Sequence, residues 1–112
     1  MPDTASIPEA TDVLVVGSGI AGCAAALAAA REGSDVALAT KASRPEGAAS
    51  WWAQGGIAVT RGDPEQFAAD VRAASGHTAD PEAVETLVEE ADAAVRDVLL
   101  DTLDISFDGE DD

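Results

Sequence analysis

A glycine motif between an apolar run and an alanine-rich run constrains the fold of this chain more than any other feature. Residues 13–16 are apolar, Gly17, Gly19 and Gly22 follow with the spacing G-x-G-x-x-G, and residues 23–30 are mostly alanine. This order predicts a strand, a tight turn and a helix whose N-terminus faces a phosphate. Gly17 would permit the turn, Gly19 the approach of a pyrophosphate, and Gly22 close packing of helix on strand. The motif therefore predicts a dinucleotide site, with a purely structural glycine turn as the alternative.

The segments around the motif complete a strand–helix–strand unit. We expect a first strand at 12–16, a helix from about residue 19 to residue 31, a helix stop at Gly33, and a second strand at 35–40. The unbroken apolar run of the first strand predicts a parallel strand that is covered on both faces. The unit predicts the α/β class, as a partial Rossmann-like domain with a parallel sheet and flanking helices.

The rest of the chain is expected to add a loop, two helices and a short strand. Residues 41–56 are rich in Gly, Ala and Ser without a period, which is typical of a functional loop. The sequence Asp-Pro-Glu, at 63–65 and again at 80–82, predicts a helix start with an Asp cap and Pro in the first position. Apolar residues then recur every three or four positions over 84–99, as in an amphipathic helix. The alternation at 103–107 predicts a strand.

The composition is strongly acidic. The chain has 22 Asp and Glu against 6 Lys and Arg, a net charge of −16. Binding to nucleic acid or to an anionic membrane needs a basic surface, so we expect neither as a partner. Two interpretations stay open: an acidic solvated surface with no binding role, and a halophilic protein whose self-repulsion is screened by a high-salt cytoplasm.

No targeting segment is visible in the sequence, and this and the cysteine content fit a cytoplasmic location. Residues 1–11 are polar and acidic, unlike a signal peptide, and the longest apolar stretch, 13–30, is interrupted by glycines and is not a plausible membrane span. The one cysteine, Cys23, cannot form an internal disulfide, which fits a reducing compartment. Its alanine neighbours favour a small buried residue over a reactive thiolate.

The position that often holds a ribose-binding acid carries no carboxylate. In dinucleotide-binding folds this acid lies about 20 residues beyond the glycine motif. That position falls near Thr40, which is followed by Lys41. The Thr40 hydroxyl can form a hydrogen bond, and Lys41 can approach a phosphate or the ribose. The missing acid disfavours NAD, while Arg44 is either a surface residue or a ligand for a 2′-phosphate.

Three pieces of the sequence resemble a known family. GSGIAG at 17–22, LATK at 38–41 and ASWWAQGGIAV at 49–59 are similar to the N-terminal flavin-binding part of the L-aspartate oxidase family. This family belongs to the wider succinate dehydrogenase and fumarate reductase flavoprotein group. The most specific piece is WAQGGIA at 52–58, and the resemblance covers nearly all of the chain after residue 11.

The resemblance implies FAD as the cofactor and no metal. In the succinate dehydrogenase branch a loop histidine attaches to the flavin, but the corresponding position here is Ala49, so a non-covalent FAD is implied. The long loop with its two tryptophans would then lie against the cofactor or another domain. The implied cofactor-binding residues are Gly17, Ser18, Gly19, Ile20, Ala21, Gly22, Thr40, Lys41, Ala49, Ser50, Trp51, Trp52, Ala53, Gln54, Gly55 and Gly56.

The family oxidises L-aspartate to iminoaspartate for quinolinate and NAD biosynthesis, with a hydride passing from the substrate to the flavin. Its members are several times longer than 112 residues, and their substrate domain and catalytic residues follow this region. We therefore expect residues 1–11 to be a disordered lead-in and 12–112 an incomplete FAD-binding domain of a truncated protein. The chain alone would bind FAD weakly, and would meet L-aspartate only if the missing domain were supplied. No catalytic residue is assigned, and His77 is interpreted as a surface or packing residue.

Two other functions stay open. The first is a free-standing, non-catalytic module that binds a dinucleotide or a partner chain. The second is a small NAD-dependent reductase, which the missing strand-end acid disfavours.

Overall fold

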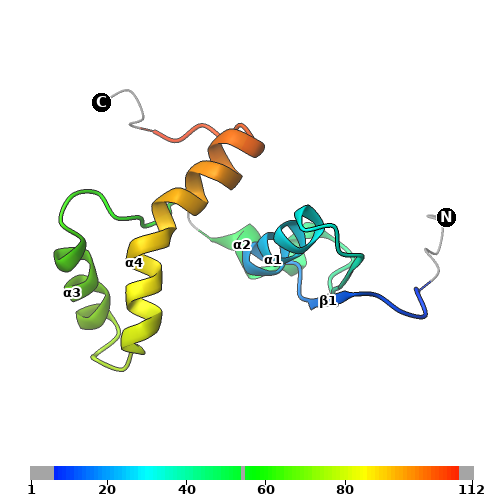
Figure 1. Ribbon diagram of the computed structural model, residues 1–112, viewed down its shortest axis with the longest axis horizontal. Helices are drawn as coiled ribbons and strands as arrows, with labels where there is room; N and C mark the ends of the chain where they lie inside the picture. Colours follow the sequence, from blue (N-terminus) through cyan, green and yellow to red (C-terminus); the bar gives the residue numbers. More distant parts are fainter. Residues whose placement is uncertain (1–6, 54, 109–112) are drawn as a thin grey trace. The chain divides into compact units, whose positions relative to one another are not determined.

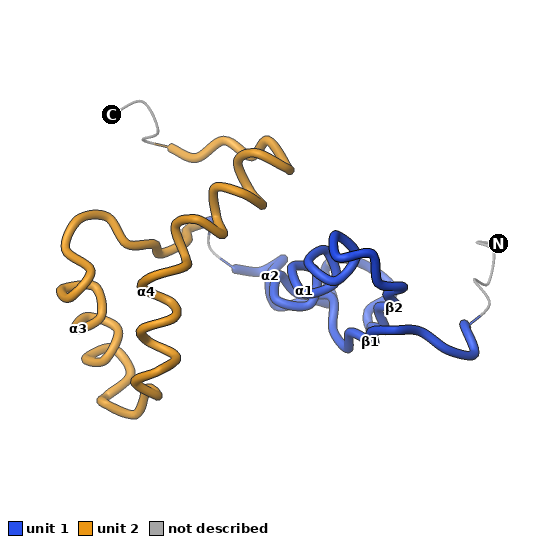
Figure 2. The backbone as a smooth tube through the Cα atoms, viewed as in Figure 1, with its two compact units in different colours: residues 1–55 blue, residues 56–112 orange. Residues whose placement is uncertain are grey.

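The computed structural model describes residues 7–53 and 55–108, and the chain forms two compact units, residues 1–55 and residues 56–112 (Figure 2). The first unit contains β1 (Val13–Val16), α1 (Ile20–Arg31) and β2 (Val36–Ala39), of which Figure 1 labels β1 and α1 and Figure 2 labels all three. The second contains α3 (Pro64–Ala74) and α4 (Pro81–Val95). Both units therefore carry the main elements that the sequence predicts for them.

The two strands form a parallel pair. Val13 lies opposite Val36 and Val16 opposite Ala39. The start of the pair is fixed by polar contacts, since the Asp35 amide donates to the Asp12 carboxylate (2.9 Å) and the Thr11 hydroxyl donates to the Asp35 carbonyl (2.8 Å). A parallel pair joined through a helix confirms the predicted strand–helix–strand unit.

Helix α1 lies between two glycines, Gly19 and Gly33. Gly19 is its N-cap residue, and Glu32 and Gly33 follow its last turn. The Gly33 amide donates to the Ala30 carbonyl (3.0 Å) and the Ser34 amide to the Ala29 carbonyl (3.2 Å), which satisfies carbonyls that have no partner within the helix. The predicted helix and its stop at Gly33 are confirmed.

Close packing of α1 on the sheet depends on Gly22. A Cβ atom at this position would overlap the Gly17 carbonyl oxygen and would lie 3.4 Å from Val15 Cγ1. Val15 is accordingly buried beneath the helix, with 9% of its surface exposed. The opposite face of β1 is open, because Leu14 and Val16 are 61% and 80% exposed. The expectation of a strand covered on both faces is therefore wrong for the described part of the chain.

Cys23 is exposed rather than buried, contrary to expectation. None of the residues of α1 is fully buried, because the helix covers only two strands and presents the rest of its surface to solvent. The thiol lies 3.5 Å from the Ser18 carbonyl oxygen, to which it donates a weak hydrogen bond.

The segment predicted as a functional loop, residues 41–56, contains short helical turns. Residues Pro45–Gly47 form a 3₁₀ turn, η1, and Ala49–Trp52 form α2. Sequence periodicity could not reveal them, because each is about one turn long or shorter and a helical pattern needs several turns. These turns give the loop a defined path past the glycine motif.

The second unit is a helical hairpin with a small core. Ala68 of α3 packs with Val84 and Val88 of α4, and all three are buried. Each helix starts as its Asp-Pro-Glu sequence predicts: Asp63 accepts a hydrogen bond from the Glu65 amide (3.0 Å), and Asp80 accepts two. The predicted helix starts are therefore confirmed by their cap geometry.

The strand predicted at 103–107 is absent, and the chain folds back there onto the preceding helix. A π-helical segment, η2 (Arg96–Thr102), continues α4. The Leu103 amide donates to the Val98 carbonyl (3.0 Å), and the Ile105 amide to the Leu99 carbonyl (2.8 Å). Asp104 has a left-handed φ of 53°, a conformation that ends helices and interrupts strands. These local bonds use the backbone groups that a strand would have offered to a neighbour.

Candidate functional site

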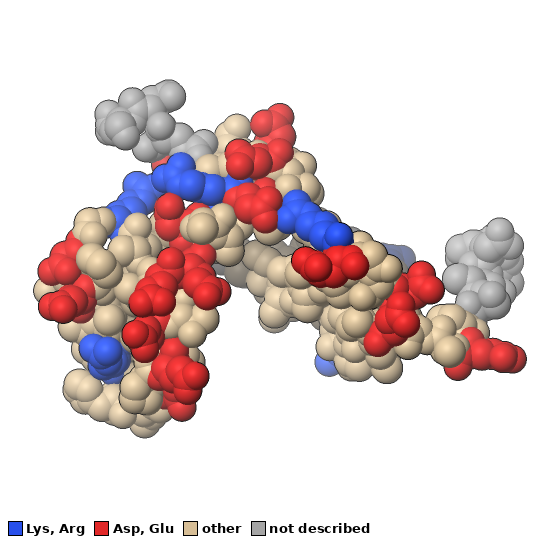
Figure 3. All heavy atoms as spheres, in the orientation of Figure 1, with Lys and Arg blue, Asp and Glu red and all other residues tan. Residues whose placement is uncertain are grey.

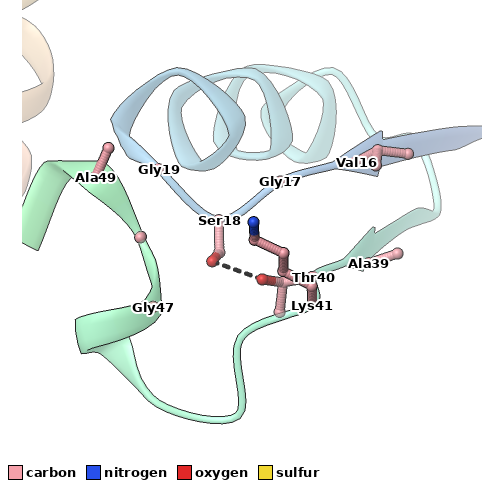
Figure 4. Close-up of a pocket in the computed structure, with 10 residues that line it drawn as sticks. Val16, Gly17, Ser18, Gly19, Ala39, Thr40, Lys41, Gly47 and Ala49 are labelled. Atoms are coloured by element: carbon pink, nitrogen blue, oxygen red, sulfur yellow. Dashed lines mark hydrogen bonds between the residues drawn. The ribbon is translucent and has the colours of Figure 1, made fainter.

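A pocket of about 390 Å³ lies at the carboxyl ends of β1 and β2, beside the glycine motif (Figure 4). Its lining combines the last residue of each strand, the turn into α1, and the loop that follows β2. The lining residues are Val16, Gly17, Ser18, Gly19, Ala39, Thr40, Lys41, Gly47, Ala48 and Ala49. The pocket therefore occupies the edge of the sheet where open α/β folds bind their ligands.

The glycine turn gives the pocket its backbone wall. Gly17 has a φ of +114°, which side chains other than hydrogen rarely allow. Its amide donates to the Ala39 carbonyl at 2.8 Å, so the turn is fastened to the end of β2. The first amides of α1 lack partners within the helix and lie at the positive end of its dipole. An anion at this place needs no basic side chain, which suits an acidic chain.

Thr40 and Lys41 bring polar groups from β2 to the turn. The hydroxyl oxygens of Ser18 and Thr40 are 2.9 Å apart and share a hydrogen bond, and Thr40 Oγ1 also accepts from the Ala42 amide (3.1 Å). In Figure 4 the Lys41 side chain extends back toward the Gly17–Ser18 turn. Among the described lining residues Lys41 is the one with an ionisable side chain. The site thus offers one cation, hydroxyls and helix amides, a set suited to a phosphorylated ligand.

The loop forms the other wall of the pocket. The Ser50 hydroxyl accepts a hydrogen bond from the Ile20 amide at 2.9 Å, which places the start of α2 against the start of α1. Gly47 and Ala48 line the pocket although the sequence did not single them out. Gly47 approaches Ala42 so closely that a side chain at residue 47 would overlap the Ala42 methyl group, but the sequence around this turn carries no distinguishing signal.

The other predicted site residues fall into two groups. Ile20, Ala21 and Gly22 belong to the first turn of α1 and support the pocket without lining it. Trp51 and Trp52 are 57% and 73% exposed, and neither lines the pocket. Ala53, Gly55 and Gly56 are also exposed and outside the lining, while Gln54 lies outside the described residues.

The lining of the pocket offers the groups that a phosphorylated nucleotide needs. A Cβ atom at Gly19 would lie 3.3 Å from the Ser50 hydroxyl, and a side chain at Gly22 would overlap the Gly17 carbonyl oxygen, so the backbone cradle requires glycine at residue 22. Its amides, hydroxyls and Lys41 match the chemistry of a pyrophosphate and a ribose. In the described part of the chain no three His, Cys, Asp or Glu side chains are grouped to hold a metal ion.

A parallel strand–helix–strand unit with a pocket at its glycine turn defines a dinucleotide-binding α/β domain. The family described as FAD binding domain matches residues 12–112. The chain therefore belongs to this FAD-binding family, and its cofactor is FAD.

Curated relatives carry the name L-aspartate oxidase. The chain is 64% identical over 101 residues to that protein of Halobacterium salinarum, a match covering 90% of the chain and 20% of the relative. It is 42% identical over 95 residues to that of Mycobacterium tuberculosis (81% and 18%) and 43% identical over 90 residues to that of Streptomyces coelicolor (78% and 15%). The chain thus spans about a fifth of the length of these relatives. No solved structure is significantly similar to it, and none of its described helices is long and apolar enough to cross a membrane.

Proposed function

We propose that this chain is the FAD-binding segment of an L-aspartate oxidase, which converts L-aspartate to iminoaspartate in the cytoplasmic route to quinolinate and NAD. The observation that carries the proposal is the pocket at the glycine turn, in a chain that the FAD-binding family covers from residue 12 to residue 112. The names of the relatives support the choice of substrate. When bound, FAD supplies the redox chemistry by accepting a hydride.

The residues of this chain would hold and orient the cofactor. The amide of Gly19 and the amides of the first turn of α1 beyond Ile20, whose own amide is bonded to Ser50, would bind the pyrophosphate, because they meet the negative charge at the positive end of the helix dipole. The hydroxyl of Thr40 and the ammonium of Lys41 would contact the ribose or a phosphate. The loop from Ala49 to Gly56 would reach the flavin ring, with Trp51, Trp52, Ala53, Gln54 and Gly55 along its path.

The attachment of FAD would be non-covalent, and the chain alone would not oxidise L-aspartate. Ala49, at the position that corresponds to the attachment histidine of related flavoproteins, lines the pocket with a methyl group. Among the described lining residues only Lys41 is ionisable, which leaves no carboxylate or imidazole to take the substrate proton. We therefore propose cofactor binding, without turnover, as the activity of these residues.

A titration with FAD tests the proposal. We expect weak but saturable binding of FAD, followed by quenching of flavin and tryptophan fluorescence, and no hydrogen peroxide on addition of L-aspartate. The substitution Gly22→Ala should weaken FAD binding about tenfold or more, because the new methyl forces α1 away from the Gly17 carbonyl. Ala25→Gly, on an exposed position of the same helix, controls for lost helix stability. Wild-type protein that binds NAD as well as FAD, or neither, would contradict the proposal.

A further inference from the structure

The loop that follows β2 is fastened to the glycine turn at both of its ends. At the entry, the hydroxyls of Thr40 and Ser18 share a hydrogen bond of 2.9 Å. At the exit, the Ile20 amide donates to the Ser50 hydroxyl, also at 2.9 Å. Ser18 and Ile20 flank Gly19, so both ends of the loop meet the three residues that would face a phosphate.

Contacts within the loop keep it compact between these ends. The Gly47 amide donates to the Arg44 carbonyl at 3.0 Å, and the Trp52 indole Nε1–H donates to the Glu46 carbonyl at 2.7 Å. A Cβ atom on Gly47 would collide with Ala42, which shows how closely the two limbs of the loop approach. The loop is therefore held together by its own contacts, and its two hydrogen bonds to the turn join it to α1 and β1.

Ser50 gives α1 a distant side-chain cap, because the helix has no local one. Helix N-caps are usually Ser, Thr, Asp or Asn, whose side chains accept from amides two or three residues ahead. Here the N-cap is Gly19, which has no side chain, and the hydroxyl that accepts from the first turn comes from 30 residues further along the chain. A side chain at residue 19 would crowd that hydroxyl, because its Cβ would lie 3.3 Å from Ser50 Oγ. Because Gly19 has no side chain, the Ser50 hydroxyl can approach the start of α1 and accept from the Ile20 amide.

We propose that Ser50 is a positioning residue that fixes the loop on α1 before a ligand arrives, so that the loop wall of the pocket is set in advance. A preset wall lowers the ordering cost of binding. Its effect on the cofactor rests on the proposed function, whereas the capping of Ile20 does not. The two parts are therefore tested separately.

The first test uses the ligand-free 112-residue chain with Ser50→Ala, Ser50→Thr and Ser43→Ala. Ser43 is an exposed serine of the same loop and serves as the matched control. Ser50→Ala should speed exchange of the Ile20 amide hydrogen roughly two- to tenfold. It should also lower the fluorescence anisotropy of tryptophan, which reports on this loop alone because both tryptophans of the chain lie in it. Ser50→Thr, which keeps the hydroxyl, and Ser43→Ala should behave as wild type.

Unchanged Ile20 exchange and anisotropy in Ser50→Ala would overturn the capping. If Ser50→Ala does not fold, the wild-type protein is measured by itself. The proposal requires its Ile20 amide hydrogen to exchange more slowly than that of an unstructured peptide of the same sequence. Exchange as fast as in the peptide would refute the proposal.

The second test measures FAD affinity of the same variants. Ser50→Ala should bind FAD roughly two- to tenfold more weakly than wild type, and Ser50→Thr and Ser43→Ala should not differ from it. Unchanged affinity, together with faster Ile20 exchange, would refute the positioning role and leave a structural cap. Weaker binding with unchanged ligand-free exchange would also refute it, because Ser50 would then act only by touching the cofactor. Wild-type protein that binds no FAD would refute the proposed function but not the capping.

Discussion

The turn after α3 places two consecutive residues in the left-handed region. Gly76 and His77 each have a φ of about +62°. The His77 amide donates to the Arg72 carbonyl at 2.9 Å, and the Gly76 amide to the Ala73 carbonyl at 3.0 Å, so both residues take part in ending the helix. Glycine adopts this conformation freely, whereas histidine does so at an energetic cost. His77 is exposed, in keeping with its interpretation as a surface residue.

The first prediction follows from that cost. His77→Gly should raise the free energy of unfolding by about 1 kcal/mol, because the backbone hydrogen bond remains and the steric penalty is removed. Ala73→Gly, on an exposed position of α3 with helical geometry, should lower it by about 0.5–1 kcal/mol. Urea denaturation followed by circular dichroism measures both. A destabilised His77→Gly protein would show that the imidazole makes a favourable contact that outweighs the strain.

At the scale of single residues, the sequence predicted the pocket better on one wall than on the other. The glycine motif, Thr40 and Lys41 could be placed because each follows a strand, and parallel strands end at the same edge of a sheet. The sequence could not place Gly47 and Ala48 in the pocket. The loop that carries them is held by a backbone hydrogen bond and by the Trp52 indole N–H bonded to a backbone carbonyl, and many small residues at 47 and 48 would be compatible with both. The exposure of Cys23 could not be inferred either, since it depends on how many strands the helix covers.

At the scale of elements, the two helices of the second unit differ in how strongly they are capped. Asp80 accepts from the amides of Glu82 (2.9 Å) and Ala83 (3.1 Å), whereas Asp63 accepts from that of Glu65 alone. Helix α4 also supplies two of the three residues of the buried core. The start of α4 therefore matters more to the stability of this unit than the start of α3.

The second prediction compares these caps. Asp80→Ala should lower the free energy of unfolding by about 1–2 kcal/mol, and Asp63→Ala by about 0.5–1 kcal/mol. Asp80→Asn keeps an acceptor oxygen and should restore most of the loss, which separates the hydrogen bonds from the interaction of charge with the helix dipole. Denaturant midpoints of the three variants provide the measurement. Equal losses at the two positions would refute the argument from hydrogen-bond number.

Some predicted elements are present in the structure and others are not, and the difference follows from the hydrogen bonds that each segment makes. The strand–helix–strand unit and both capped helices have strong local signals, and the structure confirms them. Residues 103–107 alternate as a strand should, but a strand also needs a neighbour, and these residues bond instead to the carbonyls of η2. The turns η1 and α2 are too short to show a period. The strand–helix–strand unit and the capped helices could therefore be predicted, whereas the single turns and the fold-back after η2 could not, because their hydrogen bonds leave no periodic pattern in the sequence.

At the scale of the whole chain, negative charge is spread over both units, as the face in Figure 3 shows. The outer face of α4 is the clearest case, since it carries the exposed residues Glu82, Glu85, Glu89 and Glu90. Glu85 and Glu89 are four positions apart on one helix, a spacing at which like charges repel. The described part of the chain does contain compensating pairs, such as Arg96 with Asp92 at 2.9 Å. With a net charge of −16 they leave most of the repulsion in place.

The third prediction concerns salt. Raising KCl from about 0.1 M to about 1 M shortens the screening length from about 10 Å to about 3 Å, so the thermal midpoint should rise steeply and then level off. Replacing Glu85 and Glu89 together by Gln should raise the midpoint at low salt and flatten its dependence, because a repulsive pair is removed. Arg61→Gln, which removes a positive charge from the same unit, should make the dependence steeper. A midpoint that rises linearly with salt and equally in all three proteins would instead indicate a general effect of salt on apolar burial. That result would count against the halophilic interpretation, because the charge pattern would then have no part in the response.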